Sequence, residues 1–381
     1  MNWFMENMGY QENYLPFCQA GLGNEVEILC SKHYPKSREF IKKSNNNINL
    51  SEWPLRIKRL NSLFIQNCIE QNWYLNLRKE INNCRPDIIH LHNIWDLPTL
   101  QYLLINLFNN KGKANIFVDN HIDNGNFEYR NIYKIIYYFG LIKRIAIPLM
   151  LRRKFTFISV NPYSEYCLYT YFGIPEEKIR YLPLGIDNEK IFFSQVEREK
   201  MREKYAVKEN DIVFTFSGVF EYNKSLPDLI TAFKVLAKKY RHVYLLMIGD
   251  GEMPQDEEFN LLKKERRIIL SGWQPVDKLY WWYSMADIGV IPGKLGGIRD
   301  ILAAARPLII NDDLAVSYLL EYKNGLIFRR GNIKELICAM DTYIKNPNLI
   351  REHGEKSLRL TNEKLSWRNV ASRSLQIYKE G

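Results

Sequence analysis

The sequence VYLLMIGDG at residues 243–251 decides the fold class, because six largely apolar residues run directly into a glycine-rich turn. A short, nearly continuous Val/Ile/Leu run suits a strand of a parallel sheet that is covered on both faces. The turn at 249–251 lets the backbone come close to a ligand, although any tight turn between a strand and a helix has a similar composition. The stretch therefore predicts one strand–turn unit of an α/β domain.

The same pattern of short apolar strands and amphipathic helices extends in both directions from this stretch. Strands are expected at residues 25–30, 87–91, 115–118, 156–160 and 179–182, and in a second series at 212–216, 243–248, 268–270, 288–291 and 308–310. Helices are expected at 226–240, 277–285 and 333–344. This alternation predicts parallel sheets with helices on both faces.

The two series of strands indicate two domains. A chain of 381 residues exceeds one ordinary core and suits two domains of roughly 150–200 residues each. Pro183 and Gly185 end the first series, and a charged stretch at 197–200 opens the second. We expect an N-terminal domain at 1–190, a C-terminal domain at 191–364 and a final helix at 365–381. Two doubly wound sheets in tandem predict a cleft facing the carboxyl ends of both sets of strands.

The start of the chain departs from the usual order of a doubly wound domain. A turn-and-helix signal, Gly9 followed by residues 12–20, comes almost at once. Residues 1–8 leave little room for a strand and its loop, so we expect the first strand to be truncated. That strand is normally central in the sheet, and its loss would reduce stability.

The charge and the cysteines narrow the class of protein. The net charge of +10 suggests an anionic partner such as a nucleotide or an acidic membrane surface, and a merely solvated basic surface explains it equally well. Nucleic acid is disfavoured because the basic residues are spread along the chain and form no known module. The six cysteines show no CxxC spacing, so a reduced, cytoplasmic protein without disulfides or zinc is expected.

One segment has the composition of a membrane-interface helix. No secretory signal opens the chain, and no run of 18 apolar residues occurs. Residues 133–151 come nearest, but Lys134, Lys143 and Arg144 interrupt them, and three basic residues follow at 152–154. Such a mix suits a helix lying in a membrane interface. A helix packed on its own domain with a basic outer face is the alternative.

Polar residues follow several of the predicted strands, where α/β sheets bind ligands. Gly218 follows the strand at 212–216, and Lys224 precedes the next helix, where it can neutralise a pyrophosphate. His121 follows the strand at 115–118, and functional residues concentrate on such loops. His90 and His92 project to one face of a strand end. They offer two ligands for a metal, but with no third in view we expect them to support the loop.

A third loop, PGKLGGIRD at 292–300, precedes a helix that we expect to begin near Ile298. Gly296 and Gly297 would present free backbone N–H groups to an anion or to sugar hydroxyls. Asp300 lies in the first turn of this helix, where a carboxylate is favoured by the helix dipole, so capping alone would explain it. The commonest hydrolase, NTPase and protease motifs do not occur.

Taken in order, these features resemble those of the retaining GT-B glycosyltransferases of family four, also called the group 1 transferases. The matching stretches are residues 9–12, 23–26, 87–92, 160–178 and 184–187 in the first half, and 218–224, 248–252, 286–288 and 324–326 in the second. Residues 366–378 resemble the last helix of this family, which crosses back onto the first domain. The resemblance implies a GT-B fold with two Rossmann-like domains.

The resemblance also implies a role for each matched residue. His121 would contact the donor sugar near the reacting carbon. Lys224 would bind the donor pyrophosphate and stabilise the departing nucleotide diphosphate, which needs no metal or other cofactor. Asp300 would hold the nucleotide ribose. The other donor-side residues would be Gly218, Gly249, Gly296, Gly297 and Ile298, with Trp273 near the base, and the acceptor side would be Gly9, Tyr10 and Glu12.

The implied function is the retaining transfer of a sugar from a nucleotide-sugar to a polysaccharide or lipid-linked glycan, at the inner face of the cell membrane. Two departures from the family pattern favour a weaker enzyme: Val219 replaces an expected Arg or Lys, and Pro292 stands where the first glutamate of the E-x7-E motif belongs. Losing one such cation would cost about 2–4 kcal/mol in the transition state. The alternatives are a non-catalytic sugar-nucleotide-binding relative and a GT-B sugar-nucleotide epimerase.

Overall fold

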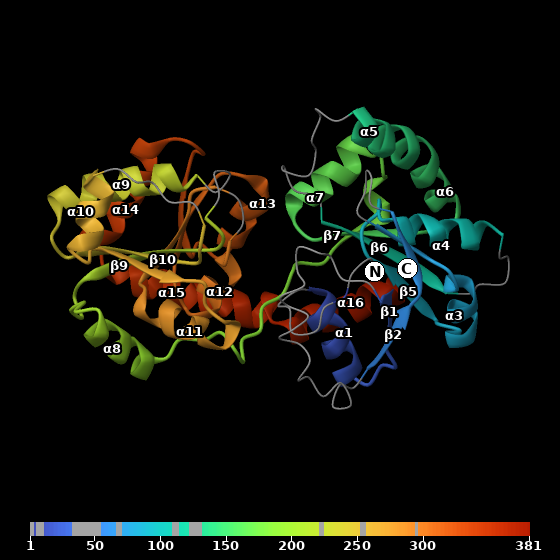
Figure 1. Ribbon diagram of the computed structural model, residues 1–381, viewed down its shortest axis with the longest axis horizontal. Coiled ribbons are helices and arrows are strands. Elements are labelled where there is room, and N and C mark those ends of the chain that lie inside the picture. Colours follow the sequence, from blue (N-terminus) through green and yellow to red (C-terminus); the bar gives the residue numbers. More distant parts are fainter. Residues whose placement is uncertain are drawn as a thin grey trace. The chain divides into compact units, whose positions relative to one another are not determined.

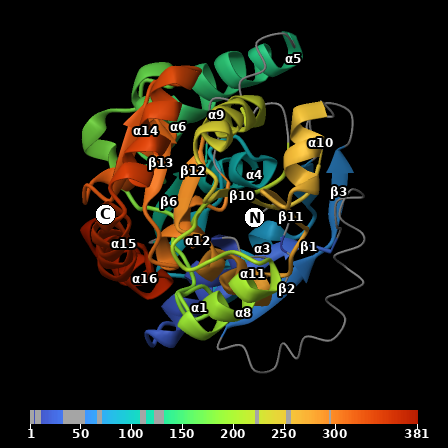
Figure 2. The same ribbon diagram turned by 90° about the vertical axis from the view of Figure 1, so that its left-hand side faces the viewer.

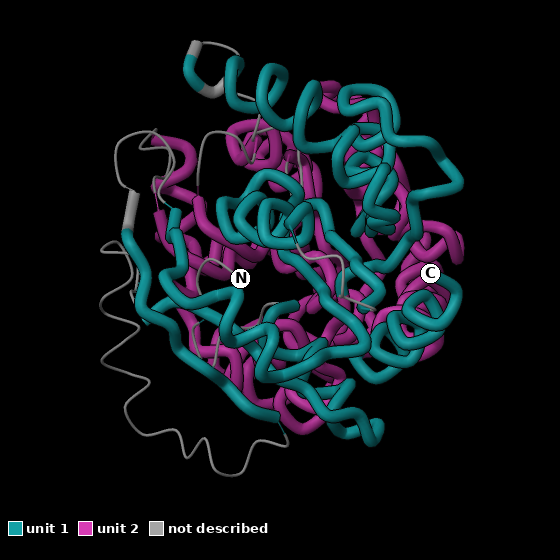
Figure 3. The backbone as a smooth tube through the Cα atoms, turned by 90° about the vertical axis from the view of Figure 1, so that its right-hand side faces the viewer, with its two compact units in different colours: residues 1–184, 367–381 teal, residues 185–366 magenta. Residues whose placement is uncertain are grey.

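The computed structural model describes residues 4, 11–32, 55–65, 71–108, 114–121, 132–220, 225–251, 257–293 and 296–381. The chain divides into two compact units (Figure 3). Unit 1 comprises Met1–Leu184 and Trp367–Gly381, and unit 2 comprises Gly185–Ser366. The sequence predicted the boundaries between the units near residues 190 and 365.

Unit 2 contains a six-stranded parallel sheet. Its strands are β9 (Ile212–Ser217), β10 (Val243–Ile248), β11 (Ile268–Gly272), β12 (Ile288–Ile291), β13 (Leu308–Asn311) and β14 (Gly325–Phe328). They lie in the order β11-β10-β9-β12-β13-β14, and each neighbouring pair is parallel. This is the strand order of nucleotide-binding doubly wound domains, with its topological switch point between β9 and β12. The predicted parallel sheet is confirmed, and β14 is an addition to it.

Helices cover both faces of the unit 2 sheet (Figures 1 and 2). One face carries α9 (Leu226–Lys239), α10 (Glu257–Lys264) and α14 (Ile333–Lys345), and the other carries α8 (Gln195–Lys204), α11 (Val276–Met285), α12 (Ile298–Ala303) and α15 (Asn348–Leu360). The short α13 (Leu314–Ser317) follows β13. Helix α9 has a proline in its first turn, Asp228 beside it, and Lys238 and Lys239 in its last turn, an arrangement that suits the helix dipole.

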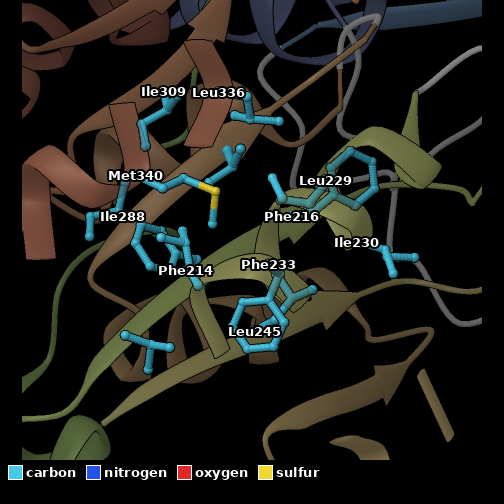
Figure 4. Packing of buried hydrophobic residues seen from close by; sticks show 14 of the residues in the cluster. Phe214, Phe216, Leu229, Ile230, Phe233, Leu245, Ile288, Ile309, Leu336 and Met340 are labelled. Atoms are coloured by element: carbon cyan, nitrogen blue, oxygen red, sulfur yellow. The ribbon is translucent and has the colours of Figure 1, made fainter. Parts of the chain in front are cut away.

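The core on the α9 face consists of large aromatic and aliphatic side chains (Figure 4). Phe214 of β9 and Leu245 of β10 are completely buried there, together with Phe233 of α9. Met340 of α14 closes the cluster from the other helix (Figure 4). Each of these side chains contributes about 1.5–3 kcal/mol by leaving water, so this core holds the sheet rigid behind its loops.

Unit 1 contains a four-stranded parallel sheet and two smaller pairs of strands. The sheet has the order β5 (Ile88–Leu91), β6 (Asn115–Asn120), β7 (Thr156–Ser159) and β8 (Ile179–Tyr181). A second parallel pair joins β1 (Glu27–Ser31) to β2 (Arg56–Leu60), and β3 (Ser62–Ile65) pairs antiparallel with β4 (Gln71–Tyr74). Among the described residues no strand connects the β1–β2 pair to the four-stranded sheet.

The predicted truncated strand at residues 1–8 lies outside the described residues, except for Phe4. The Phe4 side chain is buried against Ala20 and Ile28, and its carbonyl accepts a hydrogen bond from Arg59 of β2. Residue 4 therefore lies beside the β1–β2 pair.

The unit 1 sheet is also covered on both faces. Helices α1 (Gln11–Gly21) and α16 (Trp367–Glu380) pack on one face, where Phe117 and Ile158 meet Trp367. The Trp367 ring stacks on Tyr14 of α1 with centroids 5.7 Å apart. The other face carries α4 (Leu97–Leu107), the continuous helix α5 (Ile132–Ile135), η4 (Ile136–Ala146) and α6 (Ile147–Arg152), then α7 (Pro162–Tyr166) and η5 (Cys167–Tyr171), while α3 (Leu77–Cys84) packs beside α4.

Candidate active site

Three glycine-containing loops meet at the carboxyl ends of the unit 2 strands. Gly218 follows β9, and its backbone N–H donates to Ile248 O at 2.9 Å. Gly249 follows β10 and donates to Gly272 O at 3.1 Å. Gly297, which precedes α12, donates to Ser217 O at 2.9 Å. The predicted loops after β9 and β10 and before α12 are thus brought together at the switch point, where such sheets bind ligands.

The glycines are required here by the contact of one loop with another. Gly218 and Gly249 have φ values of +143° and +131°, which favour glycine. A Cβ atom on Gly249 would lie 2.0 Å from Gly218 O, and one on Gly296 would lie 2.2 Å from Ser217 O. The sequence interpretation assigned these glycines to ligand approach, whereas the structure adds a packing requirement that holds without any ligand.

Asp300 points into a buried polar group at the same loops. Its Oδ2 accepts a hydrogen bond from the Tyr283 hydroxyl at 3.3 Å, and that hydroxyl lies 2.7 Å from Ser217 Oγ. A Cβ atom on Gly297 would come within 2.5 Å of the Tyr283 hydroxyl, so the glycine makes room for this group. Burial raises the pKa of Asp300 to about 6. A partly buried carboxyl with a raised pKa beside these loops is a candidate functional residue.

The remaining donor-side candidates differ in exposure. Trp273 follows β11 and is 73% exposed. Ile298 is completely buried in the core, so its side chain serves packing. Val219 is exposed, as expected for a position on a loop. Lys224, the predicted pyrophosphate ligand, lies outside the described residues.

A polar cluster lies at the carboxyl ends of β5 and β6 in unit 1. Asp119, near the end of β6, is 1% exposed. Its Oδ2 lies 3.3 Å from His90 Nε2, 3.0 Å from His92 Nδ1 and 3.4 Å from His121 Nε2, and its Oδ1 accepts from the Asn93 backbone N–H at 2.8 Å. Because β5 and β6 are parallel neighbours, their ends place three imidazoles around one carboxylate.

Helices α1 and α16 complete this cluster. Glu12 Oε1 lies 2.8 Å from His92 Nε2. Burial alone would raise the pKa of Glu12, but the charge and hydrogen bond of His92 lower it to about 2. The Tyr378 hydroxyl of α16 lies 2.5 Å from His90 Nδ1 and accepts from Gln19 of α1 at 3.2 Å. Gly9 and Tyr10, the other acceptor-side candidates, lie outside the described residues.

The sequence interpretation found His121, Glu12 and the histidine pair but missed Asp119. This residue stands two positions before His121 in VDNH, and that alternation was the only available signal. With it, His92, Asp119 and His121 offer atoms within 4.8 Å of one another that could hold a metal ion, and this group includes His92 of the predicted pair but not His90. The expectation that no metal is needed stays a prediction.

Comparisons with known proteins identify the family. Residues 197–360 match the model of the glycosyl transferases group 1, and residues 18–190 match that of glycosyltransferase family 4. The chain belongs to the group 1 glycosyltransferases. It is 29% identical over 164 residues to an uncharacterized glycosyltransferase of Haemophilus influenzae, and 24% identical over 179 residues to the alpha-monoglucosyldiacylglycerol synthase of Acholeplasma laidlawii. These matches cover 41% and 44% of the chain, and 46% and 44% of the relatives, so they span just under half of each relative's length.

Solved structures extend the likeness in fold over the whole chain. The structure of HepE from Anabaena in complex with UDP has a TM-score of 0.71 and 13% sequence identity, and the match covers 99% of the chain and 98% of HepE. At this identity the likeness shows the fold alone. The predicted GT-B fold with two Rossmann-like domains is confirmed.

Proposed function

We propose that this protein transfers a sugar from a nucleotide-sugar to a glycan or lipid-linked acceptor, with retention of configuration and without a metal. The observation that carries the proposal is the meeting of the β9, β10 and α12 loops at the switch point of the unit 2 sheet, with Asp300 partly buried beside them. The family match gives the reaction class, and HepE was solved with UDP, so uridine diphosphate sugars are the first donors to test.

Each side chain has a chemical task in this proposal. Asp300 would accept hydrogen bonds from ribose hydroxyls, and Tyr283, whose hydroxyl donates to Asp300 Oδ2, would orient its carboxyl group. Lys224 and main-chain N–H groups would neutralise the pyrophosphate and stabilise the departing nucleotide diphosphate. His121 would contact the sugar near the reacting carbon. Val219 offers no charge at its position, so the basal rate depends strongly on Lys224.

Incubating the full chain with a panel of nucleotide-sugars and analysing the products by mass spectrometry tests this function. We expect slow release of nucleotide diphosphate from one donor without acceptor, and its loss in Lys224→Ala. Lys263→Ala, on the exposed surface of α10, is the control and should keep the rate. Donor-dependent thermal stabilisation without turnover would instead indicate the binding-only relative. Interconversion of free nucleotide-sugars would indicate the epimerase.

We also propose that the helix at 132–152 contacts an anionic membrane that carries the acceptor. Tyr133, Ile136 and Ile145 are 67%, 60% and 54% exposed along it, and the basic residues Arg144 and Arg152 are exposed beside them. Within the described residues every helix is too short or too polar to cross a bilayer. Apolar side chains next to cations suit adsorption to an interface. The Acholeplasma laidlawii relative is named for making a glycolipid, which supports a membrane-borne acceptor.

Co-sedimentation with vesicles tests this contact. Vesicles with anionic lipid should bind the protein more strongly than neutral vesicles, and added salt should weaken the binding because it screens the charges. Ile145→Glu should reduce the binding. Equal binding to both kinds of vesicle would remove the proposal.

A further inference from the structure

Asn311, the last residue of β13, is a completely buried asparagine that holds the loop following the neighbouring strand β12. Its Nδ2 donates to three consecutive backbone carbonyls, Ile291 O at 3.4 Å, Pro292 O at 3.1 Å and Gly293 O at 2.7 Å. A buried amide that lacks hydrogen-bond partners costs stability. The contacts with this loop therefore explain why a polar side chain is tolerated in the core.

The Asn311 side chain acts where the pairing of the two strands stops. Strands β12 and β13 are parallel neighbours, and their register ends with Ile291 opposite Ile310. The carbonyls of Pro292 and Gly293 lie beyond this last pair, and proline has no backbone N–H with which to continue the ladder. The amide of Asn311 thus supplies hydrogen bonds to the loop at the point where the sheet no longer does.

The amide group is itself fixed from the other side. Asn311 Oδ1 accepts from the Asp313 backbone N–H at 2.9 Å. The Asp313 side chain caps α13 by accepting from the Ala315 backbone N–H at 2.9 Å, and its Oδ2 accepts from Arg330 Nη1 at 3.2 Å. An amide nitrogen only donates and an amide oxygen only accepts, so these partners define the orientation of the Asn311 amide. The loop is therefore held by Asn311, and Asn311 is held by the start of α13.

The loop between β12 and α12 is also held at its second end. Its described residues are 292, 293, 296 and 297. The Gly297 backbone N–H donates to Ser217 O at 2.9 Å, and Gly297 O accepts the first helical hydrogen bond of α12, from Ile301 at 3.1 Å. Asp300 follows in the first turn of that helix. Loss of the Asn311 amide would release one end of this loop, and the displacement would pass to Gly297 and Asp300.

We propose that Asn311 is a positioning residue of the donor site, whose side-chain amide fixes the loop between β12 and α12 and with it the main chain of Gly297 and the carboxyl group of Asp300. The proposal rests on the proposed function, in which the donor binds at these loops. Asn311 acts through the loop and not by contact with the donor, because its side chain is completely buried.

A second buried asparagine of the same sheet, Asn324, provides a matched control. It is also completely buried, and its Nδ2 donates to Leu319 O at 3.1 Å and to Ser357 Oγ at 3.2 Å. Asn324 lies at the opposite end of the strands, because it precedes β14 and its carbonyl accepts from Leu308, the first residue of β13. Such sheets bind ligands at their carboxyl ends. Truncation to alanine should therefore reduce stability at both positions but should affect the donor only at Asn311.

Hydrogen–deuterium exchange of the full chain, followed by mass spectrometry, tests the effect on the loop without any assay of activity. In Asn311→Ala the amides of residues 296–301 should exchange about tenfold faster than in the unaltered protein, because the loop is held at one end only. In Asn324→Ala these amides should be unaffected, and those of residues 319–325 should exchange faster. If Asn311→Ala does not fold, the milder Asn311→Ser should show the same change at residues 296–301. Unchanged protection of these residues in the folded Asn311 variant would overturn the proposal.

Enzyme kinetics test the effect on the donor. With the donor found in the nucleotide-sugar panel, Asn311→Ala should raise the KM for the donor about tenfold and change kcat and the KM for the acceptor less than about threefold, as for a loss of donor binding. Asn324→Ala should melt at a lower temperature but keep all three constants per folded molecule. A purely structural role of Asn311 would give the same result as this control, and an unaltered KM for the donor in Asn311→Ala would refute the positioning role.

The two kinds of measurement separate this proposal from the proposed function. If the unaltered protein turns over no donor, while residues 296–301 lose protection in Asn311→Ala and keep it in Asn324→Ala, the transferase function fails and the positioning of the loop by Asn311 stands. If turnover occurs, and Asn311→Ala changes neither the protection of these residues nor the KM for the donor, the transferase function stands and the positioning fails.

Discussion

We expect the stability of unit 2 to depend strongly on the buried charge of Asp287. It lies immediately before β12 and is 5% exposed. Its Oδ1 accepts from Arg198 Nη2 at 2.9 Å, and its Oδ2 accepts from Arg202 Nη2 at 2.7 Å and from the Val213 backbone N–H at 2.8 Å. Both arginines lie on α8 and are 7% and 2% exposed. The carboxylate therefore binds the first helix of the unit to the central strand.

The stability lost in Asp287→Ala follows from the charged groups that would remain without a partner carboxylate. Arg306 is also buried nearby, and burial lowers its pKa to about 9. Arg198 and Arg202 would keep hydrogen bonds to backbone carbonyls such as Met285 O, but both buried guanidinium groups would lose the buried carboxylate that pairs with them. Removing one partner of a buried pair costs about 3–5 kcal/mol. We expect a loss of this size for Asp287→Ala.

Native-state hydrogen exchange of the β9 amides measures this loss within unit 2. The Val213 amide should lose protection most, because it donates directly to Asp287. Glu352→Ala removes an exposed carboxylate that pairs with Lys356 on α15, and because exposed ion pairs contribute little it should cost far less. A loss for Asp287→Ala no larger than that of this control would refute the assignment of a buried structural charge.

The pH dependence of the free energy of unfolding tests the role of Asp287 independently. Burial would raise the pKa of Asp287, but Arg198 and Arg202 hold it below 3.8. A lowered folded-state pKa contributes stability above the unfolded value of 3.8, and this contribution is lost as the pH falls through the folded value. The unaltered protein should therefore lose this stability only below about pH 3.8, and Asp287→Asn should lack that component of acid unfolding.

Three further predictions concern the loops and the last helix. Gly249→Ala should abolish donor-dependent thermal stabilisation and destabilise more than Gly173→Ala, because both have positive φ but only the first meets a backbone oxygen, Gly218 O at 2.0 Å. Asp300→Asn should melt higher than the unaltered protein at pH 8, and the gain should shrink as the pH falls from about 6 toward 3.8, because a partly buried carboxyl with a raised pKa costs stability when ionised. Trp367→Ala should destabilise unit 1 by about 3–5 kcal/mol in denaturant unfolding, since this ring is 6% exposed and stacks on α1.

The sequence predicted the long apolar strands to within two residues, because burial on both faces leaves a continuous hydrophobic run. Strand β10 matches at both ends, and β9 differs by one residue. Strand β2 was missed because its sequence, RIKRL, carries three cations on a strand that is partly exposed. Strand β14 was missed because it is short and begins with glycine. In both strands the position in the sheet outweighs what the local sequence favours.

The candidate sites were predicted only in part, because their supporting residues come from far along the chain. His121 was found from its place after a strand, but Tyr378, which bonds to His90, is 288 residues away from it in sequence. Tyr283 reaches Asp300 from the helix before β12 in the same manner. No local pattern encodes such contacts, since they arise only when the sheets are assembled.

Position along a parallel strand separates the roles of two buried aspartates that are otherwise alike. Asp287 lies among arginines at the amino end of β12, at the edge of the sheet opposite to the glycine-containing loops. Asp119 sits among histidines at the carboxyl end of β6, where α/β sheets bind ligands. Arginine is charged at neutral pH, which suits a permanent structural pair, whereas histidine can gain or lose a proton near neutrality. The kind of partner thus differs with the position of each aspartate: arginines surround the one at the amino end of its strand, and titratable histidines surround the one at the carboxyl end.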